Sequence, residues 1–207
     1  MKKSIIVFLL MISTGLAAQN DEAYVDTQVN EFTASLEKRG ISTYYTAKRF
    51  CLGEIEMFQL SNGKMCSSKG TYYEVYVVWK EIDGAIMIKK LDNCGLFFSL
   101  QLPDPAIYEA FLSNVSRLQA EAVKPYEVSN PENSPTLSTK VYPCRRTYSF
   151  KEGENSFNKS YKLYDLTNES KQNNLNYDYN NGLLIVELDK LLDTVIGMLD
   201  SKFRRQF

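Results

Sequence analysis

The chain has 207 residues, of which 44% are hydrophobic and 24% charged, with a formal net charge of −1 at pH 7 and no histidine. The missing imidazole excludes Ser-His-Asp and Cys-His catalysis in their usual forms, and histidine-ligated zinc, copper and haem sites. Basic and acidic residues are interspersed, which argues against nucleic acid as a partner because phosphate binding needs clustered cations. The pairs Arg145-Arg146 and Arg204-Arg205 are the local exceptions, and we expect both to be solvated surface.

The first segment is typical of a secretory signal peptide. Two lysines precede an apolar run that ends in small residues around Ala17 and Ala18, and this run is too short for a membrane span. We therefore expect a signal peptide over residues 1–18 and a single α+β domain over residues 19–207. No cysteine stands at the cleavage site, and no later apolar stretch approaches ~20 residues. The sequence thus predicts a periplasmic or secreted protein with no lipid anchor and no membrane span.

The next segment predicts an amphipathic helix over residues 22–39. Its apolar side chains recur at helical spacing, and Gly40 follows as a C-terminal stop; they are Val25, Val29, Phe32 and Leu36. From residue 41 to residue 102 the helical period disappears, and β-branched and aromatic residues alternate with turn residues. This stretch predicts an antiparallel meander of four or five strands.

The stretch TYYEVYVVWKEIDGAIMIKK, residues 71–90, predicts a β-hairpin. Asp83-Gly84 suits a two-residue turn, because both central positions need a positive φ. This register places Trp79 opposite Ile88 and Tyr76 opposite Leu91. Both faces of the hairpin carry bulky apolar side chains, so we expect one face to be core and the other to be covered by a helix.

Two further helices are predicted, over residues 104–122 and 184–203, although residues 183–187 could form a strand instead. In the first, Asp104 is placed as N-cap and Pro105 at the first helical position. The predicted fold class is therefore α+β: an antiparallel sheet of four or five strands packed by N-terminal, central and C-terminal helices and containing disulfides.

A loop-rich segment over residues 124–182 separates these two helices. Asn, Ser, Lys, Pro and Tyr dominate it, and two alternating runs predict one hairpin around residues 151–155. Tyrosine and asparagine together suit recognition surfaces, since tyrosine supplies rigid amphipathic area and asparagine supplies adaptable hydrogen bonds. The alternative is that these rings pack onto the sheet beneath the loops. The candidate binding residues are Tyr148, Tyr161, Tyr164, Tyr177 and Tyr179.

Four cysteines in an exported chain favour two disulfides. We expect Cys51 to pair with Cys66, which is close in the chain, and Cys94 with Cys144, which would tie the polar C-terminal half to the sheet. A zinc site would need short C-x2-C spacings, and the sequence has none. Phosphate-binding glycine motifs and a complete calcium loop are also missing, so the sequence predicts neither a metal nor a cofactor.

Carboxylate pairs are the best catalytic candidates that remain. Glycoside hydrolysis needs two carboxyl groups about 5 to 9 Å apart, one protonated and one ionised. Glu54 and Glu56 are two residues apart on an expected strand, and Glu74 could come from a neighbouring strand. The alternative is that these are solvated strand charges.

No motif identifies a family, and three functions are compatible with the sequence. The leading hypothesis is an exported, non-catalytic binding or interaction protein of the bacterial cell envelope, with a protein or a glycan as partner. The second is a carboxylate-based hydrolase acting on polysaccharide or peptidoglycan. The third is a periplasmic inhibitor or immunity-type protein.

Overall fold

The computed structural model describes residues 20–129, 144–168 and 173–206. The predicted signal peptide lies outside these residues. Within the described ranges, no helix is long and apolar enough to cross a membrane.

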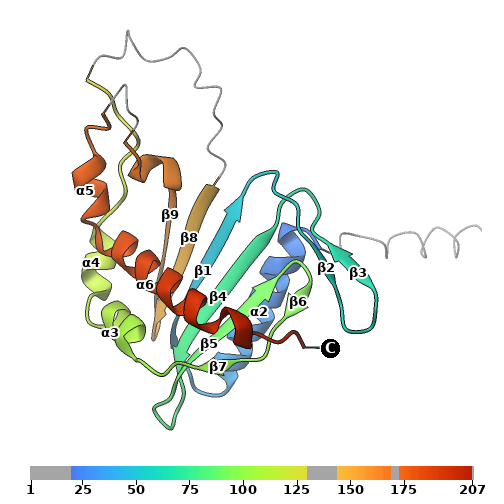
Figure 1. Ribbon diagram of the computed structural model, residues 1–207. Helices are drawn as coiled ribbons and strands as arrows, with labels where there is room; N and C mark the ends of the chain where they lie inside the picture. Colours follow the sequence, from blue (N-terminus) through green and yellow to red (C-terminus); the bar gives the residue numbers. More distant parts are fainter. Residues whose placement is uncertain (1–19, 130–143, 169–172, 207) are drawn as a thin grey trace, which may run out of the picture.

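A seven-stranded, mostly antiparallel sheet forms the centre of the fold (Figure 1). Its order is β6 (Gly95–Leu96), β5 (Ile86–Asp92), β4 (Tyr73–Lys80), β1 (Thr43–Cys51), β8 (Cys144–Glu152) and β9 (Asn155–Lys162), with β7 (Leu100–Gln101) also paired to β5. A separate hairpin consists of β2 (Met57–Gln59) and β3 (Met65–Ser67). The α+β class with an antiparallel sheet is confirmed.

The sheet is larger than predicted because the loop-rich segment contributes two of its strands. The hairpin expected around residues 151–155 is confirmed as β8 and β9, and it joins the main sheet through β1. β1 is therefore paired along both sides, with β4 and with β8. The strands predicted from residue 41 to residue 102 form only part of the sheet.

The hairpin of β4 and β5 has a longer loop than predicted. The Glu81 amide donates to the Ala85 carbonyl at 2.8 Å, which leaves three loop residues, and Gly84 has a φ of +96°. Three-residue loops commonly place glycine in this left-handed conformation. Trp79 therefore pairs with Met87 and not with Ile88, so the predicted register was wrong by one residue. A one-residue slip turns every β5 side chain to the other face.

Helix α2 (Glu22–Lys38) covers one face of the sheet, and the predicted N-terminal helix is confirmed. The Asp21 side chain accepts a hydrogen bond from the Tyr24 amide at 2.9 Å and so caps the first turn. Gly40, just past the helix, has a φ of +83°. The buried side chains of this layer are Val25, Leu36, Ile41, Tyr44, Tyr73, Val75, Val77, Trp79 and Leu91.

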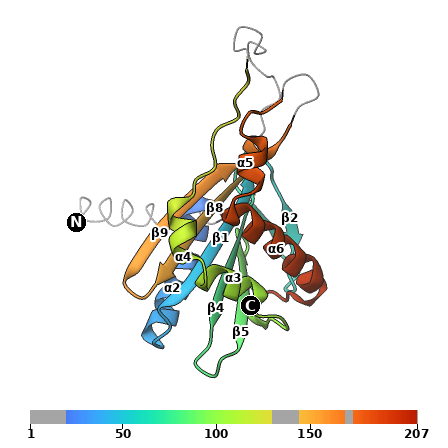
Figure 2. The ribbon, with the colours of Figure 1, turned by 90° about the vertical axis from the view of Figure 1, so that its left-hand side faces the viewer.

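Three helices cover the opposite face (Figures 1 and 2): α3 (Ala106–Leu112), α4 (Val115–Ala120) and α6 (Leu184–Leu199). The central helix predicted over residues 104–122 is thus two short helices, interrupted at Ser113 and Asn114. Residues 184–187 belong to α6 and are not a strand. Tyr76 and Val78 are buried beneath this layer. Along most of its length, the second apolar face of the β4–β5 hairpin is therefore core.

The chain forms two disulfides, but their pairing differs from the prediction. Cys51 is bonded to Cys144 and Cys66 to Cys94. The expected pairing failed because Cys51 and Cys144 are direct partners on adjacent strands, with a Cα–Cα distance of 3.8 Å. The second disulfide joins β3 to the turn after β5. Both bonds are of the kind that persists in an oxidising compartment.

The two disulfides should differ in their contribution to stability. Cys51 and Cys144 are 93 residues apart and Cys66 and Cys94 only 28, so the chain-entropy model gives about 4.5 and about 3.5 kcal/mol. We expect the C51A/C144A variant to lose about 1 kcal/mol more of the free energy of unfolding than C66A/C94A. Urea unfolding of both variants measures the difference, and the reverse order would contradict the model.

Several phenols are held inside the fold in the neutral form. Burial raises the pKa of Tyr45, Tyr76, Tyr148 and Tyr161 well above the ordinary value, and Asp189 raises it further for Tyr45, Tyr148 and Tyr161. Burial and a hydrogen bond to Glu37 raise the pKa of Tyr44 to about 12. These groups keep their protons in the folded state at a pH where the unfolded chain loses them.

Stability should consequently fall on the alkaline side. The contribution of each buried phenol is complete below about pH 10 and is lost above it, by up to about 1.4 kcal/mol per pH unit. We expect the free energy of unfolding to drop steeply between about pH 10 and about pH 11. The buried phenols should ionise only as the chain unfolds, so tyrosinate absorbance should reach its full value together with unfolding. A full rise before unfolding would contradict this prediction.

Candidate functional site

The structure distributes the five candidate tyrosines between core and surface. Tyr148 and Tyr161 are 0% and 6% exposed beneath α6, so they present almost no surface to a partner. Tyr164 stacks on Tyr126 with ring centroids 4.5 Å apart. Tyr177 is half-buried at the start of α5 (Tyr177–Asn181), and Tyr179 is 45% exposed with the Lys124 ammonium over its ring. The five rings do not form one surface.

Asparagine side chains of the same segment form hydrogen bonds with the main chain of neighbouring loops. The Asn180 side chain is fully buried; it accepts from the Lys124 amide at 2.9 Å and donates to the Lys124 and Asp165 carbonyls, both at 2.8 Å. Asn174 similarly accepts from the amides of Glu127 and Asn176. These amides are used internally, because buried polar groups need partners. The asparagine-rich composition therefore reflects a folded loop region.

A charged pocket of about 330 Å³ opens beside α6. It lies at the start of β4, where Tyr72 and Glu74 line it. Three strands and the loop after β1 contribute side chains to it. Its lining consists of Arg49, Phe50, Cys51, Glu54, Glu56, Tyr72, Glu74 and Arg146. The three glutamates singled out in the sequence therefore meet in one cavity, although Glu54 and Glu56 lie in the loop before β2 and not on a strand. We call this cavity the acidic pocket.

Ion pairs from α6 fix the arginine side of the acidic pocket. Arg146 Nε lies 3.1 Å from Asp189 Oδ2, and Arg49 bonds Asp193 one helical turn further along. Asp189 also accepts a 2.6 Å hydrogen bond from the Tyr148 hydroxyl. Burial alone would lower the pKa of Arg49, but the carboxylates of Asp189 and Asp193 raise it. Both guanidinium charges are thus held in place and already balanced.

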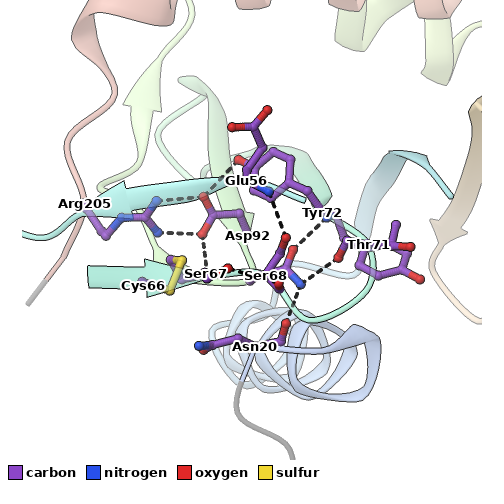
Figure 3. Close-up of a disulfide and its surroundings, with 12 residues drawn as sticks. Asn20, Glu56, Cys66, Ser67, Ser68, Thr71, Tyr72, Asp92 and Arg205 are labelled. Carbon is purple, nitrogen blue, oxygen red and sulfur yellow. Dashed lines mark hydrogen bonds and ion pairs between the residues drawn. A yellow bond between two sulfur atoms is a disulfide. The ribbon is translucent and has the colours of Figure 1, made fainter. Parts of the chain in front are cut away.

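A second network fixes the other wall (Figure 3). The Asp92 carboxylate has 0% side-chain exposure. It accepts hydrogen bonds from both Nη atoms of Arg205, at 2.5 and 2.7 Å, and from the Tyr72 hydroxyl at 3.0 Å. Burial and the charges of Asp92 and Glu74 raise the pKa of Tyr72, which therefore remains a hydrogen-bond donor. Glu74 is paired with Lys90 at 2.5 Å. Arg205 is only 11% exposed, so its expected place on the solvated surface was wrong.

Glu54 and Glu56 are the charged residues of the pocket lining whose side chains have no partner in the described part of the chain. Their backbone is fixed: the Tyr72 amide donates to the Glu54 carbonyl at 2.6 Å, and the Glu56 amide donates to Ser68 Oγ at 3.0 Å. Their carboxylates form no hydrogen bond or ion pair with any part of the chain that the structure describes. The acidic pocket therefore carries an uncompensated negative charge and favours a cationic group.

Sequence reasoning found the glutamates of the acidic pocket but missed the residues that organise it. Arg146 was expected to be surface, yet its side chain is 13% exposed. A signal for this was available on α6. Asp189 interrupts an otherwise apolar stripe of the helix, between Leu188 and Leu192, and a lone carboxylate there indicates a buried partner.

Comparison of the chain with protein-family models, curated proteins and solved structures finds no match.

The buried ion pairs of α6 should dominate the stability of this region. Asp189→Asn removes the charge that faces two largely buried guanidinium groups, which should cost about 3 kcal/mol of unfolding free energy. Asp193, at 55% side-chain exposure, is the matched control, and Asp193→Asn should cost less than about 1 kcal/mol. Urea unfolding distinguishes the two, and equal losses would contradict the assigned role of Asp189.

Proposed function

We propose that the protein is an exported, non-catalytic binding protein of the cell envelope whose acidic pocket takes a ligand carrying an ammonium group. The unpaired carboxylates of Glu54 and Glu56 carry this proposal. Every other charge around the pocket has a partner of opposite sign within the chain, so a cation supplied by a ligand would complete the arrangement.

The pocket has the features of a preorganised binding site. Its walls are fixed by ion pairs and by the Cys51–Cys144 disulfide, so few groups lose freedom when a ligand binds. Tyr72 supplies a neutral hydroxyl beside the carboxylates, and Phe50 supplies apolar area. An ammonium group occurs both in lysine-containing peptides and in amino sugars, and the pocket chemistry suits either source.

The meeting of Glu54, Glu56 and Glu74 in one cavity favours one alternative, a carboxylate-based hydrolase acting on polysaccharide or peptidoglycan. Such an enzyme needs two opposed carboxyl groups, one of which must stay protonated to act as general acid. Glu74 already forms an ion pair with Lys90, which leaves Glu54 and Glu56 as the pair to test.

Binding of a cationic ligand should depend on these two glutamates. We expect trilysine or a glucosamine oligomer to bind the intact protein, and E54Q/E56Q to weaken that binding about tenfold through loss of two partly exposed ion pairs. Isothermal titration calorimetry measures the affinity of both ligands.

The matched control is E31Q/E109Q, which removes two exposed glutamates from α2 and α3 without touching the pocket. The N-acetylated forms of both ligands should bind at least about tenfold more weakly, because they lack the charge. Equal affinity in E54Q/E56Q would contradict the proposal, and turnover of peptidoglycan that is lost in E54Q or E56Q would favour the hydrolase instead.

A further inference from the structure

The sheet face on the side of α2 is only partly covered. α2 packs on β4, β5 and β6, and β8 and β9 extend beyond it (Figure 1). Strand pairing aligns the side chains on this side of β1, β8 and β9 in three rows, which begin beside α2 and run beyond it. The rows are Thr46–Ser149–Asn158, Lys48–Thr147–Ser160 and Phe50–Arg145–Lys162. We call these nine residues the open-face groove.

Two hollows follow one another along the open-face groove. One, of about 360 Å³, lies between α2 and the sheet and includes Thr46, Ser149 and Asn158; the other, of about 260 Å³, lies towards the end of β9 and includes Arg145 and Lys162. Thr147 lines both, so the two hollows lie next to each other. Hydroxyl and amide side chains each donate and accept hydrogen bonds, which is the pattern that a chain of sugar hydroxyls requires.

The second hollow holds an unbalanced positive charge. Arg145 and Lys162 are direct partners on adjacent strands, and like charges in that position repel each other. Neither has a carboxylate partner in the described part of the chain, whereas Lys48 in the next row lies 2.5 Å from Asp26. Asp165 lines the same hollow, and its Oδ1 accepts from the Tyr126 amide at 3.0 Å. An anion between Arg145 and Lys162 would relieve their repulsion.

We propose that the open-face groove binds an acidic oligosaccharide, with an anionic substituent between Arg145 and Lys162 and sugar hydroxyls on Thr147, Ser149, Asn158 and Ser160. Two unpaired cations are too few for a nucleic-acid backbone. An extended peptide would be expected to bind along a strand edge through its main chain, whereas this surface is the face of the sheet. Apart from Phe50, the groove shares no lining residue with the acidic pocket, so its test is independent of that site.

The test uses the disulfide-bonded full chain and a short oligogalacturonate as probe. We expect calorimetry to show binding that weakens as salt is raised and that falls about tenfold or more in R145Q and in K162Q, since each removes a charge-assisted hydrogen bond. K190Q is the matched control, because Lys190 is an exposed cation on α6, on the opposite face. A neutral cello-oligosaccharide of the same length should bind at least about tenfold more weakly.

Five outcomes would overturn the proposal. Equal affinity for inorganic phosphate would show a simple anion site with no role for the sugar. Tighter binding of polyglutamate would show a peptide site. Unchanged affinity in both R145Q and K162Q, or an equal loss in K190Q, would place the binding elsewhere. An S149A/N158A variant, with both cations intact, should lose affinity for the oligogalacturonate and not for phosphate, and the absence of that difference would equally contradict recognition of the sugar.

Discussion

The pairing of β1 along both of its sides is the constraint on which the rest of the protein depends. Because alternate residues of a strand face opposite layers, β1 supplies Tyr45, Ala47 and Arg49 to the α6 side and Thr46, Lys48 and Phe50 to the α2 side. Its last residue, Cys51, bonds β8 covalently. Four consecutive residues, 48–51, therefore contribute to the open-face groove, the acidic pocket and a disulfide, so the register of this one strand determines the geometry of both proposed sites.

Buried charge is used here for positioning. Replacing a buried ion pair by apolar groups is often neutral or stabilising, so such pairs are weak evidence for stability as such. Asp189 orients two arginines beneath α6, and Asp92 holds the C-terminal segment through Arg205, whose guanidinium also lies 4.3 Å from the centre of the Phe97 ring. Both carboxylates contact side chains that line the acidic pocket: Asp189 contacts Arg49 and Arg146, and Asp92 contacts Tyr72. Its side chains are consequently placed before any ligand arrives, and the unpaired Glu54 and Glu56 are the groups left for recognition.

Local patterns in the sequence predicted the elements well and their long-range partners poorly. Helical spacing predicted helices over residues 22–39 and 184–203, and the structure has them at Glu22–Lys38 and Leu184–Leu199, because the amphipathic stripe is a local property. The register of the β4–β5 hairpin depended on whether the loop has two or three residues, which Asp-Gly does not decide. The disulfide partner of Cys51 depended on β8 joining β1 across 93 residues. The acidic pocket was only partly predictable. Its glutamates stand out in the sequence, whereas two of the tyrosines proposed for recognition, Tyr148 and Tyr161, are buried in the core.

The two sides of the main sheet end differently. Next to β5, the C-terminal segment pairs with the chain around β6 through Phe97 and Arg205, and the Gln206 amide donates to the Leu96 carbonyl. At the opposite side β9 is the last strand, and no other strand of the described residues pairs with its outer side. A free edge is a template for another chain. Since only one long edge is available in the described sheet, strand addition between copies would join two molecules and then stop, which disfavours growth into open-ended fibres.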